Sequence, residues 1–227
     1  MLNYEIDPDR LRPHLPNGTE IDEWNGKVFA SMVGFLFLDT RLMGIPFPFH
    51  RDFEEVNLRI YVRRKSGHEW RRGVVFVKEL VPRWAIARVA QLSHGEKYVA
   101  VPMRHQLDLE NGEIGANGTV RYEWKFHGDW NHLSVRTAGP ATLPSPGSEE
   151  EYIAEHYWGY ATHRTGKVIE YRVDHPPWKV RQVAESSFAC DVGSLYGPEF
   201  SDCLRGKPSS AFLAEGSAVT VFRGVPI

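Results

Sequence analysis

Three polar residues alternate with apolar ones along a short stretch of the chain and could together bind a small polar ligand. They are Glu55, Asn57 and Arg59. Alternate residues of a β-strand project from one face, so a strand here places the three side chains in a row. A few polar groups in an apolar cavity orient a ligand, and arginine pairs with carboxylate or carbonyl groups. The row therefore predicts a binding site if it lines a cavity, and an ordinary solvated face if it does not.

The same alternation occurs again in a later segment with a different expected outcome. Arg121, Glu123, Lys125 and His127 alternate with Val120, Tyr122, Trp124 and Phe126. Four long charged side chains would overfill a cavity. We therefore expect this second polar row to face water.

Catalysis by the amine of a lysine, which attacks a carbonyl carbon, is a further possible function. An amine attacks a carbonyl carbon at neutral pH only if burial or a nearby cation lowers its pKa from ~10.4. Lys78 and Lys97 are the candidates, and each stands beside a glutamate, Glu79 and Glu96. A neighbouring carboxylate raises the pKa of an ammonium group unless the carboxylate points elsewhere. A solvent-exposed lysine is the favoured interpretation at both positions.

Other catalytic and metal-binding patterns are absent from the sequence. It contains no Gly-x-Ser-x-Gly elbow, no phosphate-binding loop and no Gly-x-Gly-x-x-Gly run. None of the ten histidines forms the His-x-x-x-His pair that holds zinc on a helix. The two cysteines, Cys190 and Cys203, are expected to be reduced thiols rather than a disulfide. No metal or cofactor is expected.

The composition and net charge of the chain restrict the kinds of molecule that the protein is expected to bind. A hydrophobic fraction of 42% and a charged fraction of 25% are typical of a globular protein. The net charge of −2 offers no electrostatic basis for binding nucleic acid or an anionic membrane. The longest apolar run, residues 33–38, is far shorter than the ~18 residues that a membrane span needs. We expect a soluble cytoplasmic protein with a small-molecule ligand, for which a homo-oligomer is possible.

Most of the secondary-structure elements that must position these residues are predicted to be β-strands. Residues 28–38 follow the turn pair Asn25-Gly26 and are apolar on both faces, which predicts a central strand. Residues 55–62 and 70–80 form a predicted hairpin around the turn Ser66-Gly67.

Later segments continue this pattern. Short helices are predicted at 82–93 and at 148–160, the latter capped by Ser148. A loop is predicted at 139–147, and further strands at 98–103, 119–127, 131–137, 166–174, 180–184 and 218–222. The whole predicts one mainly β (α+β) domain over residues 1–227, a closed or cone-like antiparallel-rich barrel with two or three short helices.

Several segments resemble the YqjF-like family of uncharacterised conserved proteins, which has an acetoacetate decarboxylase-like fold. The segments that carry the resemblance are Asn3-Tyr4-Glu5-Ile6-Asp7-Pro8, Leu15-Pro16-Asn17-Gly18-Thr19, Val33-Gly34-Phe35, residues 53–59, Arg72-Gly73-Val74-Val75-Phe76, Glu96-Lys97-Tyr98, Pro102-Met103-Arg104-His105, Glu155-His156-Tyr157 and His175-Pro176-Pro177-Trp178. They cover almost the whole chain in order.

The resemblance implies a β-barrel whose cavity, in the decarboxylase, holds a Schiff-base lysine, an assisting lysine, glutamates and an arginine. It makes Glu55 the best cavity carboxylate and places Tyr98, rather than Lys97, nearest the Schiff-base position. No second lysine stands beside Lys97, which argues against decarboxylation.

Three hypotheses follow for the function. The first is a barrel that binds or transforms a small carboxylate or carbonyl compound through Glu55, Asn57, Arg59 and Tyr98, by lyase-like chemistry if it is an enzyme. The second is a non-enzymatic sensor or assembly protein, for which a surface cluster of Trp124, Trp130 and Trp158 would be a sign. The third is a Schiff-base enzyme, decarboxylase or aldolase-like, that uses Lys97.

Overall fold

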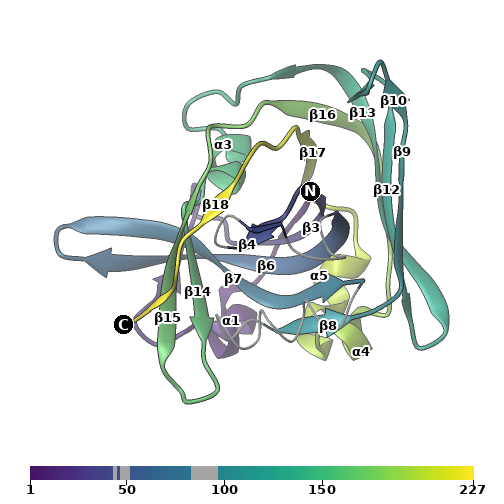
Figure 1. Cartoon of the computed structure of the whole chain (residues 1–227). Helices are drawn as coiled ribbons and strands as arrows, with labels where there is room; N and C mark the ends of the chain where they lie inside the picture. The colour runs from purple at the N-terminus through teal and green to yellow at the C-terminus, as the bar shows by residue number, and fades with distance from the viewer. Residues whose placement is uncertain (43–44, 47–51, 83–96) are drawn as a thin grey trace.

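A computed structural model describes residues 1–42, 45–46, 52–82 and 97–227 of the chain (Figure 1). The helices are α1 (Pro8–Leu11), η1 (Arg12–His14), α3 (Glu149–Ala154), α4 (Val192–Leu195), η2 (Pro198–Phe200) and α5 (Ser201–Arg205). The strands are β1 (Leu2–Glu5), β2 (Glu20–Ile21), β3 (Phe29–Phe37), β4 (Arg41–Leu42), β5 (Ile45–Pro46), β6 (Phe53–Ser66), β7 (Glu69–Val81), β8 (Tyr98–Ala100), β9 (Met103–Leu107), β10 (Leu109–Glu110), β11 (Glu113–Ile114), β12 (Thr119–Phe126), β13 (Asp129–Thr142), β14 (Trp158–Thr162), β15 (Val168–Asp174), β16 (Val180–Ala189), β17 (Ser210–Ala214), β18 (Thr220–Val221) and β19 (Val225–Pro226). Apart from Pro82, the helix predicted at 82–93 lies outside the described residues.

Most of the strands belong to one large curled sheet of 15 strands, whose main path runs β18-β15-β14-β7-β6-β3-β1-β17-β16-β13-β12-β9 (Figure 1). It is mixed, because β14 and β8 both run parallel to β7. The prediction of a mainly β fold is confirmed, but the expected closed barrel is wrong. A barrel closes only when its two outer strands pair, and in the described part of the chain β18 and β9 remain the open ends.

The predicted hairpin forms the middle of this sheet. β6 and β7 pair from Ser66↔Glu69 at the turn to Val56↔Leu80, and Gly67 in the turn has a φ of 62°. The register shifts once, between Leu58 and Arg59, where a β-bulge interrupts the pairing. A bulge opposes two residues of one strand to one of the other, so side chains beyond it change face.

The two faces of the central strands carry different cores. Alternate residues of β6, including Val56, Leu58 and Ile60, point into the main core, which also takes side chains from α1, α4, α5, β12 and β13. The opposite face packs Tyr61 against Ile153 of α3 in a second, smaller core. Glu55, Asn57 and Arg59 belong to this second face, since they alternate with the residues of the main core.

β3 is the central strand that its sequence predicts, since it pairs with β1 and β6 and its residues Phe29 to Val33 are buried. Gly34 allows β12 to cross close by. A Cβ atom at Gly34 would lie 2.7 Å from the ring of Tyr122 and 3.1 Å from Leu133. A glycine is therefore required where the two parts of the sheet meet.

Two predicted boundaries are wrong because strand pairing prevails over local signals. Ser148 caps α3 as predicted, but the helix ends at Ala154 instead of continuing to residue 160. β14 begins at Trp158 and pairs with β7, where the lack of a side chain at Gly73 admits the Trp158 carbonyl. The loop predicted at 139–147 is also too long, because β13 extends to Thr142 and pairs there with β16.

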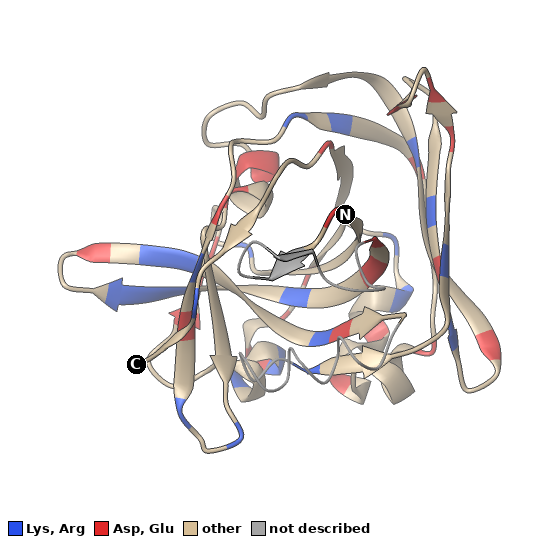
Figure 2. Ribbon diagram, viewed as in Figure 1, with Lys and Arg blue, Asp and Glu red and all other residues tan. Residues whose placement is uncertain are grey.

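The polar row of β12 faces outward, as predicted. Tyr122 and Trp124 are buried, whereas Lys125 and His127 are exposed and Glu123 is bound by Arg104 and Arg121. Figure 2 shows both signs of charge interspersed over the strands. The two alternating segments of the sequence thus meet opposite environments.

Candidate functional site

A group of polar side chains lies buried on the second face of the central sheet. Asn57 of β6 is paired directly with Glu79 of β7, and Glu79 is paired in turn with Tyr98 of β8. Directly paired residues point to the same side of a sheet. Glu55, two residues from Asn57, completes what we call the Glu55 cluster: Glu55, Asn57, Glu79 and Tyr98.

The bulge between β6 and β7 decides which residue of β7 joins this cluster. The hairpin pairs Arg59 with Phe76, and uninterrupted pairing would continue to place Lys78 opposite Asn57. Because Val77 is the extra residue of the bulge, Lys78 instead pairs with Leu58 and Glu79 takes the place opposite Asn57. The chain therefore buries a carboxyl group here rather than an amine.

The polar members at the centre of the cluster are almost fully enclosed. Glu55, Asn57 and Glu79 expose 2%, 1% and 2% of their surfaces. Asn57 donates a hydrogen bond from Nδ2 to Oε1 of Glu55 at 2.9 Å. An apolar group of Phe53 and Val81 packs with Tyr98 beside them.

Burial controls the ionisation of Glu55. Loss of hydration disfavours the carboxylate and raises the pKa of Glu55 to about 7, although hydrogen bonds from Asn57 and Glu79 pull it down. A carboxyl group with a pKa near neutrality exists in both protonation states at neutral pH, so it can accept and donate protons.

Arg59 shares this face of β6 but is directed away from Glu55. Its Nε lies 3.3 Å from the hydroxyl of Tyr61 and its Nη2 donates to the Ile153 carbonyl at 3.0 Å. Tyr61 in turn donates to Ser31 at 2.7 Å. Arg59 is therefore tied to the α3 end of the sheet. The structure brings Glu55, Asn57 and Tyr98 onto neighbouring positions and leaves Arg59 beside them rather than among them.

Lys97 lies outside the cluster. Its side chain is exposed, while its neighbour Tyr98 is aligned with Glu79. Lys78 projects to the opposite face from Glu79, and its Nζ donates to the Leu195 carbonyl. Burial, and then the charge of Lys97, lower the pKa of Lys78. The two lysines thus approach each other in space, but on the side of the sheet away from Glu55.

His156, which is not among the site residues predicted from the sequence, belongs to a second buried polar group. Its ring lies 4.8 Å from that of Tyr61, and its Nε2 lies 3.8 Å from Oδ2 of Asp22. Asp22 is held by Arg72 at 2.6 Å. Burial, chiefly, lowers the pKa of His156 to about 4, which keeps the imidazole neutral. The signal that could have drawn attention to it is the position directly after a short capped helix.

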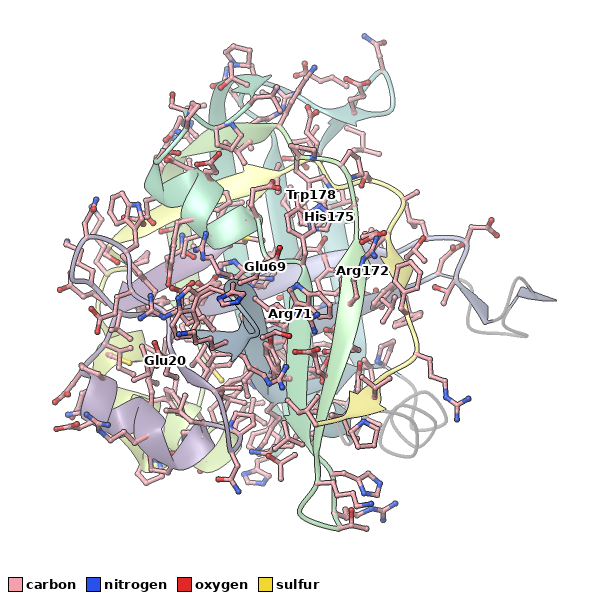
Figure 3. All side chains as sticks on the ribbon, turned by 90° about the vertical axis from the view of Figure 1, so that its left-hand side faces the viewer. Glu20, Glu69, Arg71, Arg172, His175 and Trp178 are labelled. Atoms are coloured by element: carbon pink, nitrogen blue, oxygen red, sulfur yellow. The ribbon has the colours of Figure 1, made fainter. Side chains whose placement is uncertain are left out.

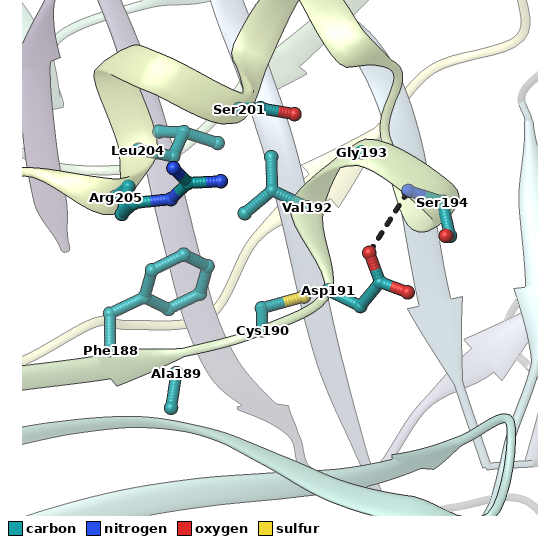
Figure 4. A pocket seen from close by; sticks show the side chains of 10 residues that line it. All are labelled: Phe188, Ala189, Cys190, Asp191, Val192, Gly193, Ser194, Ser201, Leu204 and Arg205. Carbon is teal, nitrogen blue, oxygen red and sulfur yellow. Dashed lines mark hydrogen bonds between the residues drawn. The ribbon is translucent and has the colours of Figure 1, made fainter.

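A surface pocket of about 560 Å³ lies elsewhere, between the end of β16 and helices α4 and α5 (Figure 4). Its lining includes Cys190, Asp191 and Arg205 but no member of the Glu55 cluster. Burial raises the pKa of the Cys190 thiol to about 12, so this cysteine is a poor nucleophile at neutral pH. Asp191 accepts a hydrogen bond from the backbone of Ser194 and is thereby used as a helix cap.

The tryptophans named for a partner surface do not gather on one. Trp124 is fully buried and Trp130 is 42% exposed, so the surface cluster considered from the sequence is not formed. A different aromatic group occurs near β15, where His175 stacks on Trp178 (Figure 3). The ring of His175 also stacks on that of Tyr157. Among the described residues no three His, Cys, Asp or Glu side chains gather as metal ligands, and no helix is long and apolar enough to cross a membrane.

The described strands define a mainly β protein built on one large, mixed and open sheet. The chain belongs to DUF2071, a family described as an uncharacterized conserved protein, which it matches over residues 1–218. It is 26% identical over 192 residues to the uncharacterized protein YqjF of Bacillus subtilis, covering 84% of this chain and 74% of that protein. The resemblance seen in the sequence is thereby confirmed.

Solved structures agree with this fold. The enduracididine biosynthesis enzyme MppR, complexed with pyruvate, has a TM-score of 0.67 at 16% identity, covering 99% of this chain and 86% of that one. Acetoacetate decarboxylase from Legionella pneumophila has a TM-score of 0.61 at 13% identity, covering 100% of this chain and 82% of that one. At these identities the likeness establishes the fold alone.

Proposed function

We propose that the protein binds a small carbonyl or carboxylate compound against the Glu55 cluster and acts on it by acid–base chemistry without a Schiff base. The observation that carries the proposal is the enclosed carboxyl group of Glu55, whose pKa of about 7 suits proton transfer at neutral pH. If the ligand is turned over, the reaction is lyase-like or isomerase-like.

Asn57 supports ligand binding at this place. Its Oδ1 is buried and has no hydrogen-bond partner among the described residues. A buried acceptor left unpaired costs about 1–3 kcal/mol, so a ligand hydroxyl that reaches it recovers a favourable interaction. The hydroxyl of an enol, a hydrate or a protonated carboxyl group would serve, and all three are forms of small carbonyl and carboxyl compounds.

The positions of the lysines favour a mechanism without a covalent adduct. Lys97 is exposed, and Lys78 donates its hydrogen bond on the other face of β7. A Schiff-base nucleophile would have to reach the ligand from among the side chains around Glu55. MppR is a structural neighbour with pyruvate bound, which makes 2-oxo acids the first compounds to test.

The test is ligand binding, measured by calorimetry and NMR with pyruvate, 2-oxobutanoate and acetoacetate. We expect Asn57→Leu to weaken binding about 10-fold, the effect of one hydrogen bond of ~1.4 kcal/mol. Glu54→Gln is the matched control, since Glu54 is adjacent but binds His105 on the other face. Identical affinity in the Asn57 variant, or no binding of any compound, would refute the proposal.

Borohydride reduction in the presence of the same compounds separates the two mechanisms. A ligand that binds without a covalent link leaves the intact mass unchanged. An adduct mapped to Lys97, and lost in Lys97→Met, would restore the Schiff-base hypothesis.

A further inference from the structure

The surface pocket at the end of β16 is formed by one short stretch of chain, residues 188–205 (Figure 4). After β16 the chain forms α4, turns at Gly197 and returns through η2 to α5. Gly197 has a φ of 122°, which is strained for any residue with a side chain. The two helices approach where a Cβ atom on Gly193 would lie 3.0 Å from Oγ of Ser201. The volume of about 560 Å³ between them and β16 accommodates a small organic molecule.

The guanidinium group of Arg205 lies on this pocket without a partner. In the part of the chain that the structure describes, Arg205 makes no hydrogen bond and no ion pair. Two acids stand close enough in the fold to have been candidates, Asp202 in the same helix and Asp191 in the same pocket. Asp202 instead lies 3.5 Å from Arg10, and Asp191 accepts a hydrogen bond from the backbone of Ser194 at 3.2 Å. The positive charge of Arg205 is therefore available to an anion from solution.

Apolar side chains occupy the middle of the pocket. Val192 separates Arg205 from Asp191, and Phe188 and Leu204 lie on the side of Arg205 (Figure 4). An arginine beside apolar side chains favours an anion with an apolar body, because the carboxylate pairs with the guanidinium while the body leaves water. Asp191 is ionised, since hydrogen bonds from Ser194 lower its pKa. It repels a negative group at the far end, so the carboxylate of a ligand is directed to Arg205.

Two buried groups beside the pocket also lack a hydrogen-bond acceptor. Tyr4 and Trp124 are buried, and neither the Tyr4 hydroxyl nor Nε1 of Trp124 has a partner among the described residues. Their rings lie 6.5 Å and 6.3 Å from that of Phe188. Cys190 contributes no negative charge, because burial raises the pKa of its thiol to about 12. This part of the protein is therefore rich in donors and poor in acceptors, and a carboxylate supplies acceptors.

We propose that this pocket binds a small carboxylate with an apolar body, an aryl- or alkylcarboxylate, with Arg205 at its charged end and the apolar lining along its body. The site lies on the side of the main core to which Val192 and Leu204 contribute. It shares no lining residue with the Glu55 cluster. The inference is thus independent of the proposed function and gives the protein a second small-molecule site.

The experiment uses 3-phenylpropanoate as the probe, together with two compounds that each lack one of its features. 3-Phenylpropanamide lacks the charge, and acetate lacks the ring. Affinities are measured by titration of the wild-type protein, followed in two-dimensional amide NMR spectra. We expect 3-phenylpropanoate to bind about 5-fold more tightly than the amide and at least ~10-fold more tightly than acetate. The signals that shift should belong to residues 188–194 and 201–205.

A pair of arginine variants tests the charged end of the site. Arg205→Gln should weaken binding of 3-phenylpropanoate about 5-fold, the effect of an ion pair at the upper end of the range for exposed sites. Because Arg205 is exposed and unpaired, the rest of the spectrum should keep the wild-type pattern. Arg164→Gln is the matched control, since Arg164 is another exposed arginine, in the turn between β14 and β15, and its affinity should equal that of the wild type.

Three results would overturn the proposal: no binding of 3-phenylpropanoate, equal affinity for the amide, or wild-type affinity in Arg205→Gln. Asn57→Leu identifies a ligand that has bound elsewhere. If Asn57→Leu weakens the binding and Arg205→Gln does not, the compound occupies the Glu55 cluster. The pocket at α4 and α5 then fails as a carboxylate site, while the proposed function stands.

Discussion

Replacing Glu55 by glutamine removes the ionisable group whose burial defines the site. Its pKa in the folded protein is about 7, against an ordinary value of 4.5. Each pKa unit corresponds to ~1.4 kcal/mol, so full ionisation costs the folded state about 3 kcal/mol. The folded form binds the proton more tightly than the unfolded chain does. Stability is therefore unaffected well below pH 4.5, falls as the pH rises from 4.5 to 7, and stays reduced above.

The assay is urea unfolding of the wild type and Glu55→Gln between pH 5 and pH 9. The variant has no charge to bury. Its unfolding free energy relative to that of the wild type should therefore increase by about 2–3 kcal/mol as the pH rises from 5 to 9. Glu185→Gln is the control. Glu185 is exposed, and Arg136 lowers its pKa, so it stays ionised throughout and its effect should not vary with pH.

A difference between wild type and Glu55→Gln that stays constant from pH 5 to pH 9 would refute the reasoning. It would mean that the carboxyl group keeps an ordinary pKa because water reaches it. The acid–base role would then lose its physical basis, even if a ligand binds.

Two further predictions concern the packing around the site. His156→Phe should make the protein less sensitive to acid, because the pKa of His156 is lowered from 6.5 to about 4 and stability is lost as the pH falls through this interval. The wild type should lose about 2 kcal/mol more than the variant between pH 7.5 and pH 5 in urea unfolding, and equal losses would contradict the burial of a neutral ring. Gly34→Ala should destabilise the protein by about 1–3 kcal/mol in thermal unfolding, because its Cβ would lie 2.7 Å from Tyr122. Gly206→Ala, whose Cβ would lie 3.6 Å from the nearest atom, should have little effect, and similar losses for both variants would show that the contact at Gly34 relaxes freely.

Much of the local structure follows from periodicity. The apolar run at 28–38, the hairpin and the outward row of β12 were predictable because side chains alternate along a strand whatever its neighbours are. The same alternation identifies Glu55, Asn57 and Arg59 as one row. That the chain forms a single domain stays a prediction.

Alternation alone cannot tell which row is enclosed. Arg121 to His127 and Glu55 to Arg59 look alike in sequence, yet the first row meets water and Glu55 and Asn57 meet protein. Burial depends on which segments cover a face, and those segments are distant in the chain. The sequence could not predict the open sheet for the same reason. Whether the outer strands of a sheet pair with each other depends on how segments distant in the chain are placed.

The sequence by itself determined the strand rows, the resemblance to the YqjF-like family and the position of a carboxyl group at residue 55. The tertiary structure decided that the residue opposite Asn57, on the face that Glu55 shares, is Glu79 and not Lys78. One extra residue at the bulge, Val77, shifts the register by a single position. Because side chains alternate with a period of two, that shift moves every later residue of β7 to the other face. It places a carboxylic acid, rather than an amine, beside Glu55.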